Sequence, residues 1–182
     1  MANDELARHT LPVGARDHAQ GPADAPVTLV EYGDYECPHC GRAYPMVQEV
    51  QRRLGSKLRF VLRNFPLSQA HPHAEHAAEA AEGAGAHGRF WEMHDTLFEH
   101  QQALLDRNLV GYATAVGLDA TVFESELRAH THKARVREDF TSGVRSGVNG
   151  TPTFFINGVR FDDSCDPDTL TEALRAVTRR SH

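Results

Sequence analysis

Three kinds of feature are scarce in this chain. Three cysteines in 182 residues are too few for a disulfide-dense secreted scaffold. No apolar run approaches the roughly 18 residues that a membrane-spanning helix needs. The net charge of -6, with no cluster of lysines and arginines, does not favour a nucleic-acid or anionic-membrane surface. We therefore expect neither nucleic acid nor membrane as a partner.

The amino-terminal stretch also lacks an apolar core. Residues 1–20 carry Asp4, Glu5 and Arg8, so they do not form a signal peptide. This favours a cytoplasmic protein; the alternative is a periplasmic protein whose export signal has been removed. Residues 1–25 contain Gly14, Gly21 and no periodicity, which predicts a flexible arm.

The chain beyond residue 25 has the pattern of an α/β domain. Residues 27–32 and 58–62 are apolar and predict two strands, and between them apolar residues recur at helical spacing up to Gly55. The order strand, helix, strand favours a parallel pair joined by a right-handed crossover. Glu31 falls on the apolar face of the first strand, a local conflict of the kind that marks functional sites.

From about residue 73 to 146 the strand signals vanish and helical patterns replace them. Residues 74–83 are rich in alanine, and residues 90–98 carry one apolar face. Asp106 and Asp119 are expected to be N-caps of two shorter helices. Val136, Phe140 and Val144 predict the apolar face of a final helix.

Strand signals return after residue 147. Residues 153–156 and 159–161 flank Asn157-Gly158, the dipeptide typical of a tight hairpin. A closing helix is expected from Asp166 and Pro167, with Leu170, Leu174 and Val177 on its apolar face. We assign residues 26–66 and 147–182 to one α/β domain and residues 67–146 to an inserted helical domain.

The two close cysteines are the main chemical signal. Cys37 and Cys40 lie where a helix follows directly on a strand, and Pro38 suits the first helical turn. The unpaired N–H groups and dipole at that end favour a thiolate, which is the nucleophile in disulfide exchange. We expect Cys37 to attack and Cys40, one turn later, to resolve the mixed disulfide.

Two neighbours would tune this pair. A partly protonated His39 beside the thiolate would stabilise the reduced form and make the disulfide a better oxidant. Burial raises a carboxyl pKa, so Glu31 would exchange a proton near neutral pH. The alternatives are a solvated His39 and an edge-exposed Glu31.

Thr151-Pro152 opens the third strand. A proline is disfavoured inside a sheet because it donates no hydrogen bond. A cis bond at the start of the strand would resolve this and leave the backbone of Thr151 available to an extended peptide.

Two further roles for the cysteines are considered besides the redox pair. Cys37 and Cys40 could form half of a zinc site, with ligands from His71, His73 and His76, which lie near Glu75 and Glu79, although no second cysteine pair is present. Cys165 could be a third redox thiol, but a lone cysteine is more often inert. The redox interpretation is preferred, and it needs neither metal nor organic cofactor.

Taken together, these motifs resemble the DsbA-like thiol–disulfide oxidoreductases of the thioredoxin superfamily, in the branch called thioredoxin_4 or DSBA. The resemblance is carried by LVEYGDYECPHC at 29–40, GVNGTPTFFING at 147–158, and shorter matches at 65–67, 71–72 and 90–95. It implies a thioredoxin fold with an inserted all-helical cap. It also implies a redox-active disulfide between Cys37 and Cys40, with Glu31 as buried acid and Pro152 as a cis-proline facing it.

The resemblance further implies that the substrates are protein thiols or disulfides, which Pro38, Thr151 and Pro152 help to bind. It also implies a redox partner, whose identity is unknown, and a monomer or weak homodimer. Thr151 is more typical of the isomerases and reductases of the superfamily than of strong oxidants, so the direction of electron flow stays open. Two other classes stay open as well: a glutathione-dependent transferase or isomerase, and a peptide-binding or chaperone module without enzymatic activity.

Overall fold

The computed structural model describes residues 10–180, so the first nine residues of the expected arm lie outside the described part. The chain separates into two compact units. The first comprises Met1–Gly33, Arg42–Arg63 and Thr141–His182, and the second comprises Asp34–Gly41 and Asn64–Phe140. The second unit is the helical insertion, but it also takes in the Cys37–Cys40 segment, which the sequence had suggested for the α/β domain.

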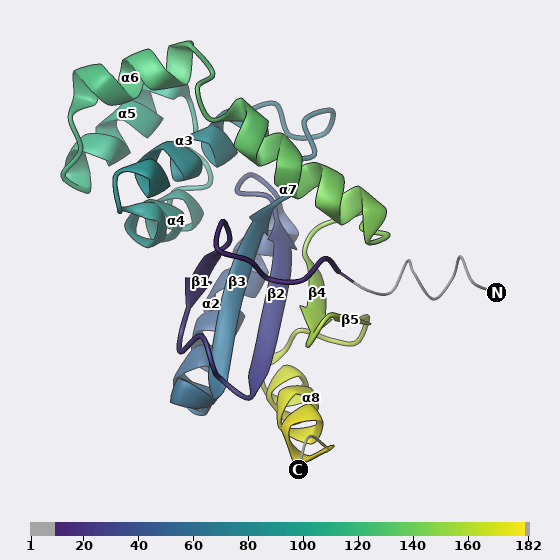
Figure 1. Ribbon diagram of the computed structural model, residues 1–182. Coiled ribbons are helices and arrows are strands. Elements are labelled where there is room, and N and C mark those ends of the chain that lie inside the picture. The colour runs from purple at the N-terminus through teal and green to yellow at the C-terminus, as the bar shows by residue number, and fades with distance from the viewer. Residues whose placement is uncertain (1–9, 181–182) are drawn as a thin grey trace. The chain divides into compact units, whose positions relative to one another are not determined.

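A five-stranded sheet forms the body of the first unit, in the order β1-β3-β2-β4-β5. Its centre is β2 (Val27–Gly33) beside β3 (Leu58–Asn64), and these run in the same direction in Figure 1. They are linked by α2 (Pro38–Leu54) and a short 3-10 turn, η1 (Gly55–Lys57). The predicted strand–helix–strand unit is confirmed.

The hairpin is also confirmed. β4 (Thr153–Ile156) pairs antiparallel with β2 and with β5 (Val159–Phe161). Asn157 and Gly158 form the turn with φ of 45° and 83°, the left-handed conformation that this dipeptide tolerates. Helix α8 (Pro167–Arg180) then buries Leu170 and Leu174.

The segment before β2 is more ordered than the sequence suggested. Residues His18–Gln20 form strand β1, antiparallel to β3. Arg63 holds the residues that precede β1 through hydrogen bonds. Its guanidinium donates to both carboxylate oxygens of Asp17 at 2.8 and 3.0 Å and to the carbonyls of Leu11 and Pro12. A three-residue strand leaves too short a pattern to detect, and its partner lies some forty positions away.

Five helices make up the rest of the insertion: α3 (Ala74–Ala86), α4 (Phe90–Glu99), α5 (Asp106–Ala115), α6 (Ala120–Arg128) and α7 (Lys133–Arg145), whose last turn falls in the first unit. α3 packs against α4, α5 and α6. Small side chains permit this central position: a Cβ at Gly83 would lie 3.3 Å from both Phe123 and His132.

Two local predictions need correction. Asp119 caps α6 by accepting from the backbone N–H of Val122, as expected, but Asp106 is the first residue of α5, and its carboxylate contacts His76 instead. Val144 is 54% exposed. Ser142 and Ser146 nearby are buried instead, and the hydroxyl of Ser142 lies 2.8 Å from that of Tyr32.

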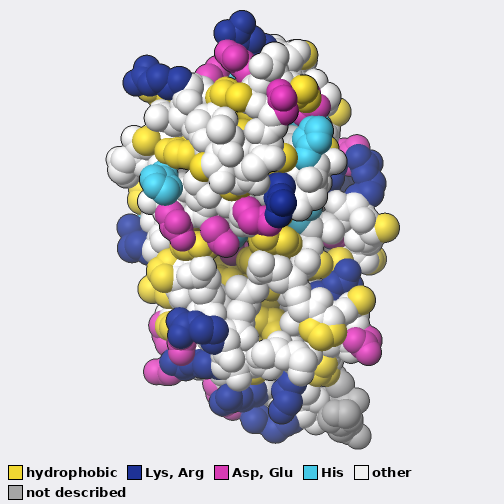
Figure 2. Space-filling view, turned by 90° about the vertical axis from the view of Figure 1, so that its left-hand side faces the viewer, with side chains coloured by type: hydrophobic (Ala, Val, Ile, Leu, Met, Phe, Trp, Pro, Cys, Tyr) yellow, Lys and Arg dark blue, Asp and Glu magenta, His cyan; other side chains and the backbone are white. Residues whose placement is uncertain are grey.

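Charges of both signs are interspersed with apolar atoms on the face shown in Figure 2. The first unit has a pocket whose lining includes Arg53, Lys57, Arg175 and Arg179. Among the described residues, no helix combines the length and apolar character needed to cross a membrane.

Candidate active site

The two cysteines of the CPHC motif lie at the first turn of α2. Both are free thiols and both are buried, with Cys37 at 3% and Cys40 at 0% exposure. The turn before the helix positions them: the N–H of Cys37 donates to the carbonyl of Asp34 at 3.2 Å, and the N–H of Asp34 points at Cys40 Sγ at 3.5 Å. Pro38 and His39 are exposed between them. The cysteine spacing, with Pro38 as the first residue of α2, agrees with the sequence analysis.

Asp34 organises this turn. Its side chain is fully buried and accepts the N–H of Glu36 at 2.8 Å and that of Leu67 at 2.9 Å. The same carboxylate lies 2.7 Å from Nδ1 of His71. One buried acid therefore ties the CPHC turn to the segment around residues 67–71.

His71 is electrostatically linked to the nucleophile. Partial burial works to lower its pKa, but the hydrogen bond and negative charge of Asp34 outweigh that effect. A negative charge on Cys37 acts in the same direction, and the net shift of the His71 pKa is upward. Because such an interaction is mutual, the protonated imidazole also favours the thiolate of Cys37.

A second anchor comes from Gln101, just beyond α4. Its side-chain amide donates to the carbonyls of Tyr35 at 2.8 Å and Cys37 at 2.9 Å. The path of this amide requires a glycine at position 41, since a Cβ there would lie 1.9 Å from Gln101 Oε1. The backbone around Cys37 is thus held by a residue 64 positions away.

Tyr35 and Glu36 complete the attachment. The buried hydroxyl of Tyr35 lies 3.1 Å from Nδ1 of His94, and its ring packs at 4.9 Å on that of Phe98, both on α4. Glu36 accepts the N–H of His73 at 2.7 Å. Every residue from 34 to 37 therefore has a bond or ring contact with the helical insertion or within the turn.

The remaining predicted site residues belong to the first unit. Glu31 is buried on β2 at 3% exposure, opposite Phe154 of β4, which agrees with its expected burial. Thr151 and Pro152 immediately precede β4, and the peptide bond between them is cis. The roles of these three residues, like those of Pro38 and His39, stay predictions.

Cys165 has the properties of an inert thiol. It is half-buried, with its sulfur 3.9 Å from that of Met46. Burial raises its pKa, and the negative charge of Glu31 adds to that effect. Little thiolate forms at neutral pH under these conditions, so Cys165 is a poor nucleophile.

The alternative of a zinc site at the cysteines gains no support. Within residues 10–180, one group of potential ligands converges, and it comprises His76, Glu79 and His130 without a cysteine. His71 contacts Asp34 instead. The positions of Asp34 and Gln101 in this site could not be predicted from the sequence, because their partners are 37 and 64 positions away.

Comparison with known proteins identifies the family. A profile of the Thioredoxin_4 family, described as Thioredoxin, matches residues 15–176. The chain belongs to the Thioredoxin_4 family.

Solved structures give this Thioredoxin_4 protein the fold of DsbA-like thiol–disulfide oxidoreductases. Oxidised BdbD from Bacillus subtilis superposes with a TM-score of 0.86 at 23% identity, covering 94% of this chain and 98% of the other. A thioredoxin-like oxidoreductase from Silicibacter pomeroyi gives 0.80 at 25% identity, with 93% and 95% coverage. The resemblance drawn from the sequence and the thioredoxin fold are both confirmed.

Curated relatives have a different name and a greater length. A protein named Na(+)/H(+) antiporter NhaA 1 from Salinispora arenicola is 47% identical over 162 residues, which are 89% of this chain and 25% of that protein. One of the same name from Mycolicibacterium vanbaalenii is 44% identical over 166 residues, 90% of this chain and 27% of that protein. The chain thus spans about a quarter of the length of these relatives.

Proposed function

We propose that this protein is a thiol–disulfide oxidoreductase that exchanges disulfides with protein substrates through Cys37 and Cys40. The observation that carries the proposal is the CPHC turn itself: two free thiols at the start of α2, with Asp34 in the same turn and bonded to His71. The fold by itself is compatible with many functions, so the function has to be inferred from the residues of the site. The paired thiols supply the chemistry.

The proposed reaction balances without an added cofactor. The Cys37 thiolate attacks one sulfur of a substrate disulfide, forming a mixed disulfide and releasing one substrate thiolate, which takes up a proton. Cys40, as thiolate, then attacks the Cys37 sulfur, forming the Cys37–Cys40 disulfide and releasing the second substrate thiol. The substrate gains two electrons and two protons. Oxidation of a substrate dithiol is the same sequence in reverse.

The surroundings suit this chemistry. His71 has a raised pKa and favours a negative charge on Cys37, and the helix N-terminus acts in the same direction. Glu31 is the buried acid that we propose to take up and return the Cys40 proton, supported by its burial and by the family resemblance. His39 is proposed to adjust the potential from its exposed position.

A substrate surface is available in the same unit as the cysteines. A cavity of about 520 Å³ is lined by Pro66, Leu67, Val136 and Phe140, and Leu67 also donates to Asp34. Its lining also includes the polar and charged side chains of Ser68, Gln69, Glu75 and Arg137, a mixture that suits an extended polypeptide with side chains of both kinds. This supports protein substrates, with Pro38, Thr151 and Pro152 proposed to dock the backbone.

The experiment that tests this function is substrate trapping. The Cys40→Ser variant should accumulate a mixed disulfide between Cys37 and substrate proteins, released by dithiothreitol, while Cys37→Ser should trap none. Equal trapping by both variants would contradict the assignment of Cys37. Tight glutathione binding with no protein adducts would indicate the glutathione-dependent class. Full function in both variants would indicate a chaperone or binding module.

The antiporter relatives favour a second, more specific candidate. We propose that the matched quarter of those proteins is a thioredoxin-like module and that this chain performs the same redox step for a transport protein. Its support is the 47% identity across 89% of the chain. The trapping experiment on membrane and soluble fractions tests it: adducts confined to soluble proteins would count against a transporter substrate.

A further inference from the structure

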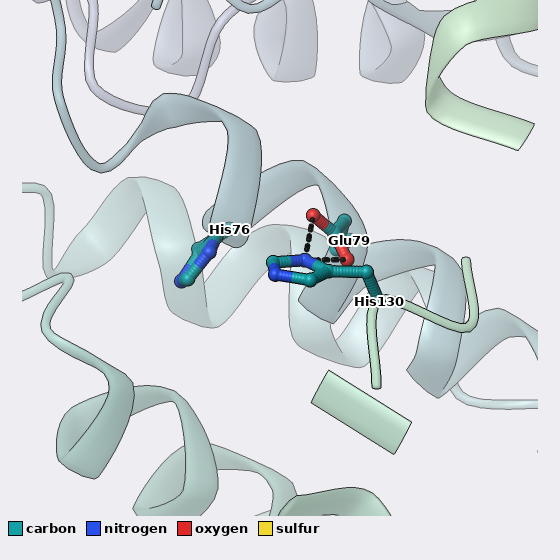
Figure 3. Close-up of side chains that lie close together, drawn as sticks. All are labelled: His76, Glu79 and His130. Carbon is teal, nitrogen blue, oxygen red and sulfur yellow. Dashed lines mark hydrogen bonds and ion pairs between the residues drawn. The ribbon is translucent and has the colours of Figure 1, made fainter. Parts of the chain in front are cut away.

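Three side chains of the helical unit lie close together in space. All three come from residues well beyond the CPHC motif in the sequence. His76 and Glu79 lie one turn apart on α3, and His130 comes from the connection between α6 and α7. Figure 3 shows the ring of His130 between the carboxylate of Glu79, to which hydrogen bonds join it, and the ring of His76. One potential ligand atom from each lies within 4.8 Å of the others. We propose that these three residues bind a zinc ion.

The carboxylate is the strongest part of this argument. Glu79 has a side chain that is 1% exposed, and its described partner is Nδ1 of His130, at 3.0 and 3.1 Å from the two oxygens. A carboxylate buried beside an imidazole is costly unless a positive charge balances it. A divalent cation between the two supplies that charge and displaces the shared proton.

His76 is arranged as metal-binding histidines are. Its Nδ1 lies 2.7 Å from the carboxylate of Asp106, the first residue of α5. Zinc-bound histidines commonly use one ring nitrogen for the metal and the other for a carboxylate, which fixes the ring and makes it more basic. Because the carboxylate of Asp106 contacts His76, it does not serve as the N-cap of α5 that the sequence suggested.

His130 follows the C-terminal end of α6. Its φ is 51°, a left-handed conformation that only a few per cent of non-glycine residues adopt. That conformation brings its ring within 5.2 Å of the ring of His76. This conformation is common directly after a helix, and here the N–H of Thr131 donates to the carbonyl of Glu126 and closes α6.

The donor set selects the kind of ion. Two imidazole nitrogens and one carboxylate suit Zn²⁺, whereas Ca²⁺ and Mg²⁺ prefer sites made of oxygen. Tetrahedral ligands at ~2.1 Å lie roughly 3.4 Å apart, so closure requires shifts of about an ångström. The side chains of His76 and His130 are 36% and 44% exposed, and they have room to make them.

The effect of such an ion would be structural. It would join α3 to the α6–α7 connection and, through Asp106, to the start of α5. His76 and Glu79 also belong to the zinc alternative considered from the sequence, but the cluster contains His130 and no cysteine, and the expectation was that no metal is needed. The proposed site does not depend on the proposed redox function.

Zinc titration by calorimetry tests the proposal, on the full chain purified without a histidine tag. All three cysteines are replaced by serine for this experiment, so that no thiol competes and no disulfide needs to form. We expect one Zn²⁺ per chain with micromolar or tighter affinity, and a melting temperature that rises with Zn²⁺ and returns with a chelator. We expect Ca²⁺ to have no such effect.

The variants make the test specific. His76→Ala and His130→Ala should each weaken Zn²⁺ binding at least tenfold, and Glu79→Gln should do the same. His87→Ala is the matched control, since His87 also faces a glutamate, Glu126 at 3.3 Å, but lies outside the cluster; its affinity should stay within twofold. If Glu79→Gln does not fold, the two exposed histidine variants decide. Absence of saturable binding, an equal response to Ca²⁺, or wild-type affinity in both histidine variants would overturn the proposal.

Discussion

His71 Nδ1 and Asp34 Oδ2 lie 2.7 Å apart, and the carboxylate is fully buried. This pair joins the turn that carries the nucleophile to a segment 37 residues further along the chain. It gives Asp34 a counter-charge and keeps His71 protonated more readily than a free histidine. A proton on His71 favours a negative charge on Cys37, because the two groups interact electrostatically.

Removing the positive charge of His71 should make Cys37 less reactive. In His71→Gln the thiolate loses a partner, so its alkylation by iodoacetamide near pH 6 should slow several-fold. The measurement is the pH profile of alkylation, which should shift to higher pH in the variant. His73→Gln is the control, because His73 contacts Glu36 through its backbone. Superimposable profiles for His71→Gln and wild type would refute the link.

Asp139 should make stability depend on pH. Burial raises the pKa of its carboxyl to about 6, against the lowering effect of Arg135, while Glu82 adds to the rise. The folded state therefore holds the proton more strongly than the unfolded state, whose pKa is about 3.8. This contribution to stability is complete below pH 4 and is lost as the pH rises through about 6.

Replacement by Asn tests this sign. Asp139→Asn cannot ionise, so the free energy of unfolding of wild type minus that of the variant should fall by about 2 kcal/mol between pH 4 and 8. Urea unfolding at several pH values measures it. Asp168→Asn, at an exposed carboxylate, should show no comparable trend. A difference that rises with pH would contradict the sign.

Arg63 should contribute far more to stability than an exposed arginine. Its side chain is 4% exposed and bonded to Asp17, so Arg63→Gln leaves a buried carboxylate without its cation and should cost about 3 kcal/mol. Arg53 is 35% exposed and pairs with the largely exposed Asp168, so Arg53→Gln should cost about 0.5 kcal/mol. Chemical denaturation of both variants measures this. Equal losses would show that the segment before β1 is not held through Arg63.

Gln101 should matter through the backbone around Cys37. Gln101→Ala removes two hydrogen bonds to main-chain carbonyls and should cost about 1–2 kcal/mol. Gly41→Ala should have a similar effect, because its Cβ displaces the same amide. Gln48→Ala, which removes one bond to Tyr44, is the control and should cost less than either. If thermal melts show that Gln48→Ala lowers stability as much as Gln101→Ala and Gly41→Ala do, the hydrogen bonds of Gln101 to the backbone are unimportant for stability.

Local patterns predicted much of this molecule. The strand before Cys37, the helix from Pro38 and the Asn157-Gly158 hairpin each depend on residues adjacent in sequence, and each is present. Buried Glu31 could be placed because alternation along a strand fixes its face.

Contacts between distant segments could not be predicted. Asp34 meets His71 across 37 positions, and Gln101 reaches Cys37 across 64, with no periodicity to reveal either. Strand β1 is too short to leave a pattern. Ser142 is buried near the exposed Val144, and its hydroxyl lies 2.8 Å from that of Tyr32. In each case the outcome depends on contacts between distant segments rather than on local propensity.

The central claim is that Cys37 and Cys40 form a redox couple. Equilibrating the full-length protein in glutathione buffers of graded potential, then alkylating and mapping the thiols by mass spectrometry, tests it directly. We expect the two cysteines to change together in one two-electron transition while Cys165 stays reduced, and the midpoint to give the direction of electron flow relative to about -270 mV for thioredoxin. If Cys37 and Cys40 never form a disulfide with each other, or titrate independently, the account is wrong.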